Sequence, residues 1–260
     1  MEERAKRLRY WIKLLMLLIS IINYESVNAQ GQGLFQLNNM CEFAVWVGTQ
    51  SNAGQPLLEA ADVALDPGMS TTVATPPGWA GRFWGRTGCM FDPITGQGMC
   101  ATGDCAGALQ CNGIGGDPPA TLAEFTLLGA DGLDFYDVSL VDGYNLPLAV
   151  APTAVDAELI SSNYSCASAG CTGDLNENCP DELQMLGSGG QIVGCRSACS
   201  AFGSPEYCCT GEYGSPATCL PTSFSQTFKF ACPRAYSYAY DDSSSTFTCV
   251  GSSYTITFCP

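Results

Sequence analysis

Apolar and polar residues alternate along several short stretches of the chain. Phe43, Val45 and Val47 are separated by single residues, which is typical of a strand with one buried face. Strand-like patterns also cover residues 34–85, 120–155 and 236–259. Pro-Gly turn signals separate several of these stretches. The pattern predicts a mainly β structure.

Two regions without this alternation interrupt the predicted strands. Residues 88–119 are rich in glycine and hold four cysteines, and cysteines are dense again over residues 160–232. Within the second region, the sequence Pro-Asp-Glu-Leu at 180–183 predicts the start of a helix, because proline and acidic residues are favoured in a first turn. No internal repeat or low-complexity linker divides the chain, so one domain with loop-rich lobes is expected.

The first 29 residues have the organisation of a secretory signal peptide. Basic residues up to Lys13 precede an apolar run at residues 14–22, and the small-residue site Val27-Asn28-Ala29 follows. A run of nine residues is too short for a membrane anchor, which needs about 20. The mature chain is expected to start near Gln30 and to be secreted to the extracellular space or the cell wall.

Charge and composition limit the partners and the chemistry of the mature chain. After removal of residues 1–29, five basic and 22 acidic residues remain. Nucleic acid and anionic membranes are poor partners for such a surface, whereas a neutral polysaccharide is not repelled. The chain contains no histidine, which excludes Ser-His and Cys-His catalysis and histidine metal sites. No cofactor is implied.

All sixteen cysteines follow the predicted signal peptide. An exported chain enters an oxidising compartment, where disulfides are the default. Thiolate metal sites are the alternative, but no repeated Cys-x-x-Cys pairs occur. The number of cysteines predicts a set of disulfides and leaves their connectivity open.

The sequence GQGMCATGDCAG at residues 96–107, followed by Cys111, resembles the signature of thaumatin-like proteins, a family of plant defence proteins. Further family-like stretches are FWGRTGC at 83–89, TLAEF at 121–125, DFYDVSLVDGYN at 134–145, Tyr-Cys-Cys at 207–209 and the Phe-Cys-Pro end at 258–260. The resemblance covers essentially all of the mature chain.

The resemblance implies an all-β fold, a flattened antiparallel β-sandwich with two disulfide-rich lobes and a short helix in the larger lobe. The single domain would cover residues 30–260. Its sandwich core would comprise residues 34–86, 120–165 and 236–260, its small lobe residues 87–119 and its large lobe residues 166–235.

The resemblance also implies a pairing for every cysteine. The eight disulfides would be Cys41–Cys259, Cys89–Cys100, Cys105–Cys111, Cys166–Cys249, Cys171–Cys232, Cys179–Cys195, Cys199–Cys208 and Cys209–Cys219.

In the family, a cleft between the sandwich and the large lobe carries one arginine and four acidic residues. The matching positions in this chain are Arg82, Glu124, Asp137, Asp142 and Asp242. Periodicity alone does not group them, because Asp137 and Asp142 would point to opposite faces of a straight strand. A bend or bulge between these two residues is therefore expected.

The acidic cleft leaves several functions open. The first is binding of β-1,3-glucan of fungal or plant cell walls in an antifungal or stress response. Tyr136 and Tyr144 are candidates for stacking on sugar rings, although as strand residues they fit the core equally well. The second is weak endo-β-1,3-glucanase activity with Glu124 as the acid and Asp137 as its partner. The third is a structural or stress protein with an idle cleft. We expect binding rather than hydrolysis, and a monomer without a membrane span.

Three further features bear on these expectations. Arg234 stands in a Cys-Pro-Arg-Ala-Tyr sequence where relatives usually have aspartate, which reverses a charge near the closing strands. Asn163-Tyr164-Ser165 is an N-glycosylation sequon next to Cys166. The extra C-terminal tail of vacuolar relatives does not follow Pro260, which favours secretion.

Overall fold

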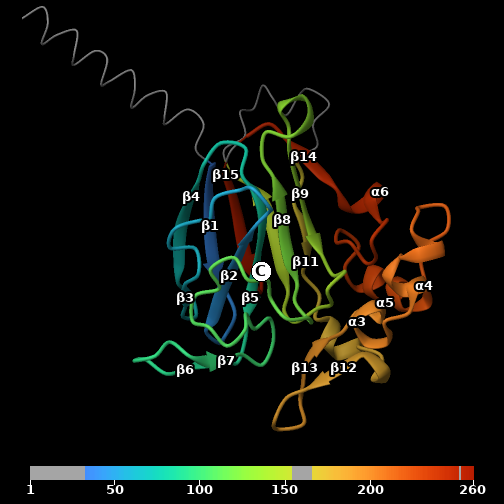
Figure 1. Cartoon of the computed structure of the whole chain (residues 1–260), viewed down its shortest axis with the longest axis horizontal. Helices are drawn as coiled ribbons and strands as arrows, with labels where there is room; N and C mark the ends of the chain where they lie inside the picture. The colour runs from blue at the N-terminus through green and yellow to red at the C-terminus, as the bar shows by residue number, and fades with distance from the viewer. Residues whose placement is uncertain (1–32, 154–165, 252) are drawn as a thin grey trace, which may run out of the picture.

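The structure is a computed structural model that describes residues 33–153, 166–251 and 253–260 (Figure 1). The predicted signal peptide and the sequon at Asn163 lie outside these residues. The described part of the chain contains no helix that is both long enough and apolar enough to cross a membrane.

Two β-sheets form the sandwich. The six-stranded sheet has the order β14-β9-β8-β5-β2-β3 and is antiparallel throughout. Its strands are β2 (Val45–Ser51), β3 (Ala64–Leu65), β5 (Ala80–Arg86), β8 (Leu122–Thr126), β9 (Asp134–Ser139) and β14 (Phe247–Cys249). The neighbouring strands β5, β8 and β9 form the centre of this sheet, which is the part that positions the candidate site.

The second sheet has five strands in the order β11-β10-β15-β1-β4. Its strands are β1 (Gly33–Asn39), β4 (Ser70–Thr75), β10 (Leu148–Pro152), β11 (Ala169–Cys171) and β15 (Ser253–Phe258). The mainly antiparallel sandwich that the family resemblance implied is confirmed, with one difference. β1 and β15, which lie near the two ends of the domain, pair in parallel.

Aromatic side chains fill the space between the two sheets. The Phe35 ring lies 4.5 Å from the Phe125 ring and 5.0 Å from the Phe83 ring, centroid to centroid. Tyr254 completes the cluster, with its ring 5.1 Å from that of Tyr136. These side chains are buried and alternate with outward-facing residues along each strand, as expected for a sandwich.

The small lobe packs on one end of the six-stranded sheet and projects as a hairpin, which is formed by β6 (Met90–Phe91) and β7 (Gly98–Met99) (Figure 1). Two outward-facing side chains of β5 anchor this lobe. Trp84 is fully buried and donates a hydrogen bond from Nε1 to the carbonyl of Gly103 at 2.8 Å. Arg86 is also fully buried and donates to the carbonyls of Ala108 and Leu109 at 2.9 and 2.8 Å.

The large lobe contains a hairpin and short helices. The hairpin is formed by β12 (Gln184–Leu186) and β13 (Ile192–Cys195). Its helical elements are η2 (Leu175–Asn178), η3 (Asp181–Leu183), α3 (Ala198–Phe202), α4 (Pro205–Cys208), η4 (Gly211–Tyr213) and α5 (Ser223–Ala231). A further short helix, α6 (Asp242–Ser245), lies between the large lobe and β14. A separate 3₁₀ turn, η1 (Ala130–Gly132), precedes β9.

Three local expectations differ from the structure. The helix expected at residues 180–183 is the single 3₁₀ turn η3, because the chain becomes extended at Gln184 and enters β12. Only the second half of the stretch 236–259 forms strands, since Asp241 accepts hydrogen bonds from the backbone and hydroxyl of Ser237 in an irregular segment before α6. Phe43 lies outside β2 and its side chain is 48% exposed.

Eight disulfides connect the sheets and lobes: Cys41–Cys259, Cys89–Cys100, Cys105–Cys111, Cys166–Cys249, Cys171–Cys232, Cys179–Cys195, Cys199–Cys208 and Cys209–Cys219. They are the same pairs that the family resemblance implied. Cys41–Cys259 closes a loop of 218 residues and holds the end of β15 next to β1. Two of the bridges lie within residues 87–119 and four within residues 166–235, so they fix the lobes against internal rearrangement.

Candidate functional site

Three charged residues lie side by side on the outer face of the six-stranded sheet. Arg82 of β5 is the cross-strand partner of Glu124 in β8, and Glu124 is the partner of Asp137 in β9. Because side chains alternate along a strand, the neighbours Phe83 and Phe125 point into the core. The strand register therefore groups the three charges.

A bend after β9 adds Asp142 to this group. β9 ends at Ser139, and the chain turns so that the Gly143 backbone N–H donates to the carbonyl of Leu140 at 2.9 Å. Gly143 has a φ of 92°, which favours glycine. The expected bend between Asp137 and Asp142 is thus present.

Asp242 is the first residue of α6, in the irregular segment between the large lobe and β14. Its Oδ1 atom accepts a hydrogen bond from the Tyr236 hydroxyl at 2.9 Å, and Tyr236 also bonds the Thr246 hydroxyl. Tyr236 lines the cleft but was not among the predicted site residues. The sequence feature that could have identified Tyr236 is its place at the end of the Cys-Pro-Arg-Ala-Tyr stretch at 232–236.

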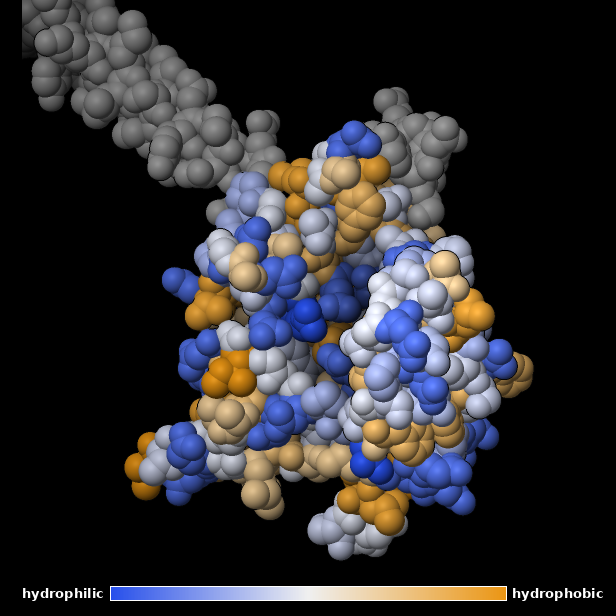
Figure 2. All heavy atoms as spheres, turned by 45° about the vertical axis from the view of Figure 1, so that its right-hand side comes forward, coloured by the Kyte–Doolittle hydropathy of each residue, from blue (hydrophilic) through white to orange (hydrophobic). Residues whose placement is uncertain are grey.

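These residues surround one open cleft of about 420 Å³ between the sandwich and the large lobe. Figure 2 shows strongly hydrophilic side chains in a hollow between these two parts of the molecule. All five residues that the family resemblance assigned to a cleft line it, namely Arg82, Glu124, Asp137, Asp142 and Asp242.

The two central carboxyl groups of the cleft have raised pKa values. Burial raises the pKa of Asp137 to about 8, helped by the negative charges of Glu124 and Asp242 and opposed by Arg82. Burial also raises the pKa of Glu124, and the Asp142 charge acts in the same direction, whereas Arg82 lowers it. Two neighbouring carboxylates that cannot both ionise easily retain a proton at neutral pH.

Arg82 is the counter-charge of this pair. Its Nη2 atom lies 3.4 Å from Oε1 of Glu124, which favours ionisation of Glu124 over that of Asp137. Arg82 Nε and Asp137 Oδ1 are buried and have no hydrogen-bond partner among the described residues. Buried polar atoms are normally paired, so these two are suited to a polar ligand that enters the cleft.

The model of the thaumatin family matches residues 39–260 of the chain. The chain belongs to the thaumatin family. A pathogenesis-related thaumatin-like protein 3.5 from Cryptomeria japonica is 52% identical to it over 230 residues, which cover 88% of this chain and 91% of that protein. A protein from Prunus avium named glucan endo-1,3-beta-glucosidase is 46% identical over 251 residues, or 96% of this chain and 98% of that protein.

The fold of this thaumatin-family chain is also found in more distant structures. The structure of a laminaripentaose-producing β-1,3-glucanase in complex with laminaritetraose matches it with a TM-score of 0.59 at 12% identity. The match covers 88% of this chain and 99% of that one. At this identity the likeness concerns the fold alone.

Neither of the two tyrosines considered for sugar stacking reaches the cleft of this thaumatin-family chain. Tyr136 is 1% exposed, stacks in the aromatic core and donates from its hydroxyl to the carbonyl of Ala167 at 2.6 Å. Tyr144 is fully buried and donates to the carbonyl of Gly173 at 3.1 Å. The core alternative for these residues is therefore correct.

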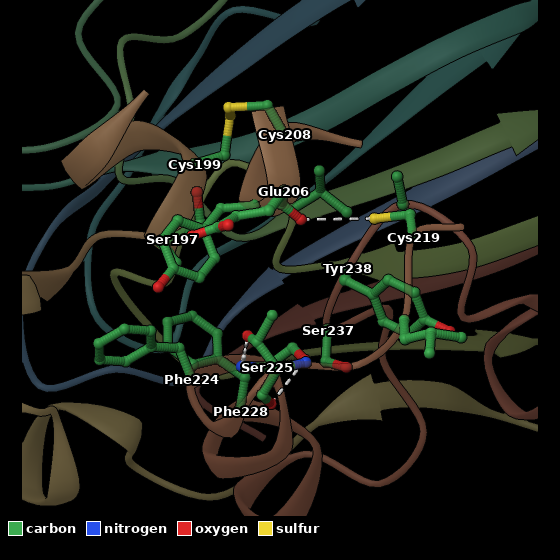
Figure 3. Close-up of a pocket in the computed structure, with 16 residues that line it drawn as sticks. Ser197, Cys199, Glu206, Cys208, Cys219, Phe224, Ser225, Phe228, Ser237 and Tyr238 are labelled. Carbon is green, nitrogen blue, oxygen red and sulfur yellow. Dashed lines mark hydrogen bonds between the residues drawn. A yellow bond between two sulfur atoms is a disulfide. The ribbon is translucent and has the colours of Figure 1, made fainter. Parts of the chain in front are cut away.

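A small, partly open pocket of about 60 Å³ lies behind the cleft wall in the large lobe. Val141 and Ala239 separate it from the cleft, since both line the two spaces. Figure 3 shows Phe224, Phe228 and Tyr238 around it, together with the Cys199–Cys208 disulfide. Its size suits one or two water molecules rather than a sugar, so it belongs to the packing of the lobe.

No cluster of three or more histidine, cysteine or acidic residues with metal-binding geometry occurs in the part of this thaumatin-family chain that the structure describes. The cleft can offer carboxylate oxygens as hydrogen-bond acceptors, Arg82 as a donor, and a neighbouring pair of carboxyl groups that hold a proton. These groups suit a ligand with many hydroxyls, and they are the groups that acid catalysis of glycoside hydrolysis requires.

Proposed function

We propose that this thaumatin-family protein is a secreted defence protein that binds β-1,3-glucan through the acidic cleft. The observation that carries the proposal is the register of Arg82, Glu124 and Asp137 on adjacent strands, with two buried and unpaired polar atoms among them. Sugar hydroxyls would donate to the carboxylates and accept from Arg82. Such hydrogen bonds to charged groups are stronger than neutral ones.

The charge of the chain supports a neutral ligand. The chain carries 25 acidic and 10 basic residues, so a polyanion would be repelled from the cleft, whereas glucan would not. Several relatives carry names of defence proteins, such as pathogenesis-related protein 5 from Arabidopsis thaliana, which is 53% identical over 226 residues.

The test is a pull-down on insoluble β-1,3-glucan with the double variant Asp137→Asn, Asp142→Asn. We expect the fraction bound to fall at least tenfold, because position 142 loses a charged acceptor for sugar hydroxyls, and at position 137 one carboxyl oxygen becomes an NH₂ group that cannot accept. Asp117→Asn is the matched control, since Asp117 is an exposed acid outside the cleft. Unchanged binding by the double variant would instead support the idle cleft of a structural or stress protein.

Weak hydrolysis of β-1,3-glucan is the second candidate, because Glu124 and Asp137 are direct cross-strand neighbours with raised pKa values. The name of the Prunus avium relative, glucan endo-1,3-beta-glucosidase, supports it. The ion pair with Arg82 favours a carboxylate at Glu124 and a protonated acid at Asp137. If the cleft hydrolyses glucan, we therefore propose Asp137 as the acid and Glu124 as its partner, the reverse of the assignment from the resemblance.

A sugar-release assay on soluble laminarin separates binding from hydrolysis. If hydrolysis occurs, both Glu124→Gln and Asp137→Asn should lose it, and the acidic limb of the pH–rate profile should follow the ionisation of Glu124. Release of no sugar by the parent protein, together with normal binding by Glu124→Gln, would exclude the enzymatic function.

Secretion is part of the proposal and rests on the basic, apolar and small-residue segments of residues 1–29. A C-terminal fluorescent fusion should accumulate outside the cell or in the cell wall. Mass spectrometry of the secreted protein should give an N-terminus near Gln30. Retention of the fusion in the vacuole would contradict the expected destination.

A further inference from the structure

A second and larger pocket lies at the end of the sandwich, between the β6–β7 hairpin and the β12–β13 hairpin, which both hang below the sheets in Figure 1. Its volume is about 740 Å³, and it shares no lining residue with the acidic cleft. We call it the lower pocket. We propose that it binds a short neutral saccharide, with Trp46 as the stacking surface and Asn176 as a hydrogen-bond acceptor.

Aromatic side chains form the apolar wall of the lower pocket. Phe43, which is 48% exposed, and the partly exposed Trp46 both line it. The Trp46 ring packs against the ring of Phe91 with 5.0 Å between the centroids, so its orientation is fixed. A fixed, partly exposed indole presents a flat apolar face at little entropic cost, which suits the C–H face of a sugar ring.

Asn176 supplies an unused acceptor. Its Nδ2 atom donates to the carbonyl of Asn145 at 3.3 Å, which holds the amide plane in place. Asn145 is itself buried and donates to the Gly85 carbonyl and the Thr102 hydroxyl, each at 2.8 Å. The other end of the Asn176 amide, Oδ1, is buried and finds no partner in the described residues. A ligand hydroxyl that donates to Oδ1 would satisfy it.

The remaining polar groups select against an anion. Glu42 and Asp174 line the lower pocket, and no lysine or arginine does so. The Asp174 carboxylate already accepts from the backbone N–H of Asn176 at 2.9 Å, so it is held in position. A pocket with an aromatic wall, two carboxylates and an amide acceptor fits a ligand that has many hydroxyl donors and no negative charge.

Disulfides hold the walls of the pocket before any ligand arrives. Cys41–Cys259 fixes the sandwich segment and Cys89–Cys100 the small-lobe segment that border it. Cys179–Cys195 ties η2, which carries Asn176, to the end of β13. A rigid site loses little conformational entropy on binding. Its volume lies within the range of small-molecule sites, about 300–1,000 Å³.

The tryptophans allow a direct test. Trp79 and Trp84 are fully buried, and Trp11 lies in the segment expected to be removed, so acrylamide quenching of the secreted protein reports on Trp46. The probes are laminaritriose, cellotriose and xylotriose. We expect at least one of them to reduce the quenching constant about twofold in a saturable manner. Asn176→Ala should weaken this protection at least tenfold.

Two variants separate the lower pocket from the cleft and from misfolding. The double variant Asp137→Asn, Asp142→Asn should keep full protection of Trp46, since neither residue lines the lower pocket. Phe43→Ser should weaken protection without affecting the fold, because Phe43 is exposed and outside any strand. Near-ultraviolet circular dichroism of each variant checks folding.

Three outcomes would overturn the proposal. The first is no protection by any of the three sugars at millimolar concentration. The second is protection that disappears in the cleft double variant and survives in both Asn176→Ala and Phe43→Ser. The third is protection by trilysine and not by the sugars, which would assign the pocket to a cationic peptide.

Discussion

Glu124 and Asp137 face each other directly across β8 and β9, with Arg82 on the far side of Glu124. Directly opposed residues in an antiparallel pair have Cβ atoms about 4.5–5.5 Å apart. Two carboxyl groups at that separation in a partly buried cleft repel each other when both are ionised. One proton shared by the pair removes this repulsion, which is why the protonation of Asp137 is central to the cleft.

The raised pKa of Asp137 predicts a pH dependence of stability. Its pKa is about 8 in the native protein and near 3.8 in an unfolded chain. Between these two values, the native state keeps a proton that the unfolded state has released. The stabilisation that comes from protonated Asp137 is therefore fully present below pH 3.8 and is lost as the pH rises through about 8. Asp137→Asn cannot lose a proton and should remove this dependence.

Denaturant unfolding of the two proteins with intact disulfides at pH 5 and pH 8 measures the effect. From pH 5 to pH 8, the free energy of unfolding should fall by roughly 1–3 kcal/mol less in Asp137→Asn than in the parent. The full effect would be about 1.4 kcal/mol for each pH unit, but solvent reaches the cleft and weakens it. Asp117→Asn should behave like the parent. An identical pH slope in parent and Asp137→Asn would show that Asp137 is ionised at neutral pH.

Arg82 should set the protonation of both acids. Its charge lowers the pKa of Glu124 and of Asp137, so Arg82→Gln should raise both. Carbon-13 NMR titration of the side-chain carboxyls measures this effect. The two signals with the highest titration midpoints should move to higher pH by about one unit or more, and one unit of pKa corresponds to ~1.4 kcal/mol. Signals that keep their midpoints in Arg82→Gln would mean that the ion pair with Glu124 does not form in solution.

The strands of the sandwich follow from the sequence, but the grouping of the cleft does not. Alternation places Phe125 and Glu124 on opposite faces of one strand, and Tyr136 and Asp137 on opposite faces of the next. The structure buries both aromatic side chains. Alternation does not predict that Glu124 lies opposite Asp137, because register depends on the turn and on all neighbouring strands. The family resemblance grouped these residues in one cleft, and the register is seen only in the structure.

The large lobe shows where the sequence pattern fails. The resemblance implied a short helix in this lobe, but the residue pattern does not locate α5, although Thr222 and Ser225 form a capping box at its start. Proline and acids at 180–183 predicted a helix that is one 3₁₀ turn, because nearby disulfides and the β12–β13 hairpin override local preference. The number of cysteines likewise left the disulfide connectivity open, and the resemblance specified it.

Arg86 was overlooked in the sequence, and it should be one of the main supports of the small lobe. Burial lowers its pKa, and its guanidinium donates to two carbonyls of the lobe, those of Ala108 and Leu109. Arg86→Lys keeps the charge but has no planar fork, so at least one buried carbonyl loses its partner. The free energy of unfolding should fall by about 2–4 kcal/mol.

Limited proteolysis of Arg86→Lys provides the local measurement. Cleavage should appear first within residues 88–117, since this lobe loses its anchor while the sandwich remains folded. Cleavage that begins in the large lobe, or a stability equal to that of the parent, would contradict the anchoring role of Arg86.

Gly48 allows Trp84 to fill the space between the sheet and the small lobe. A Cβ atom at position 48 would lie 2.4 Å from Cε2 of Trp84. Trp84 cannot move away, because it is fully buried, bonded to the Gly103 carbonyl and in contact with Gly116 on another side. Gly48→Ala should therefore destabilise the protein by about 1–3 kcal/mol, the usual cost of overpacking.

Gly115→Ala is the matched control for this prediction. Its nearest neighbour is the amide of Gln50 at 3.2 Å, a flexible side-chain end that can shift. Thermal unfolding followed by tryptophan fluorescence should show a lower midpoint for Gly48→Ala and a nearly unchanged midpoint for Gly115→Ala. Equal midpoints for the two variants would mean that the small lobe is loose enough to let Trp84 move, and the walls of the adjoining lower pocket would then be less rigid than the disulfides imply.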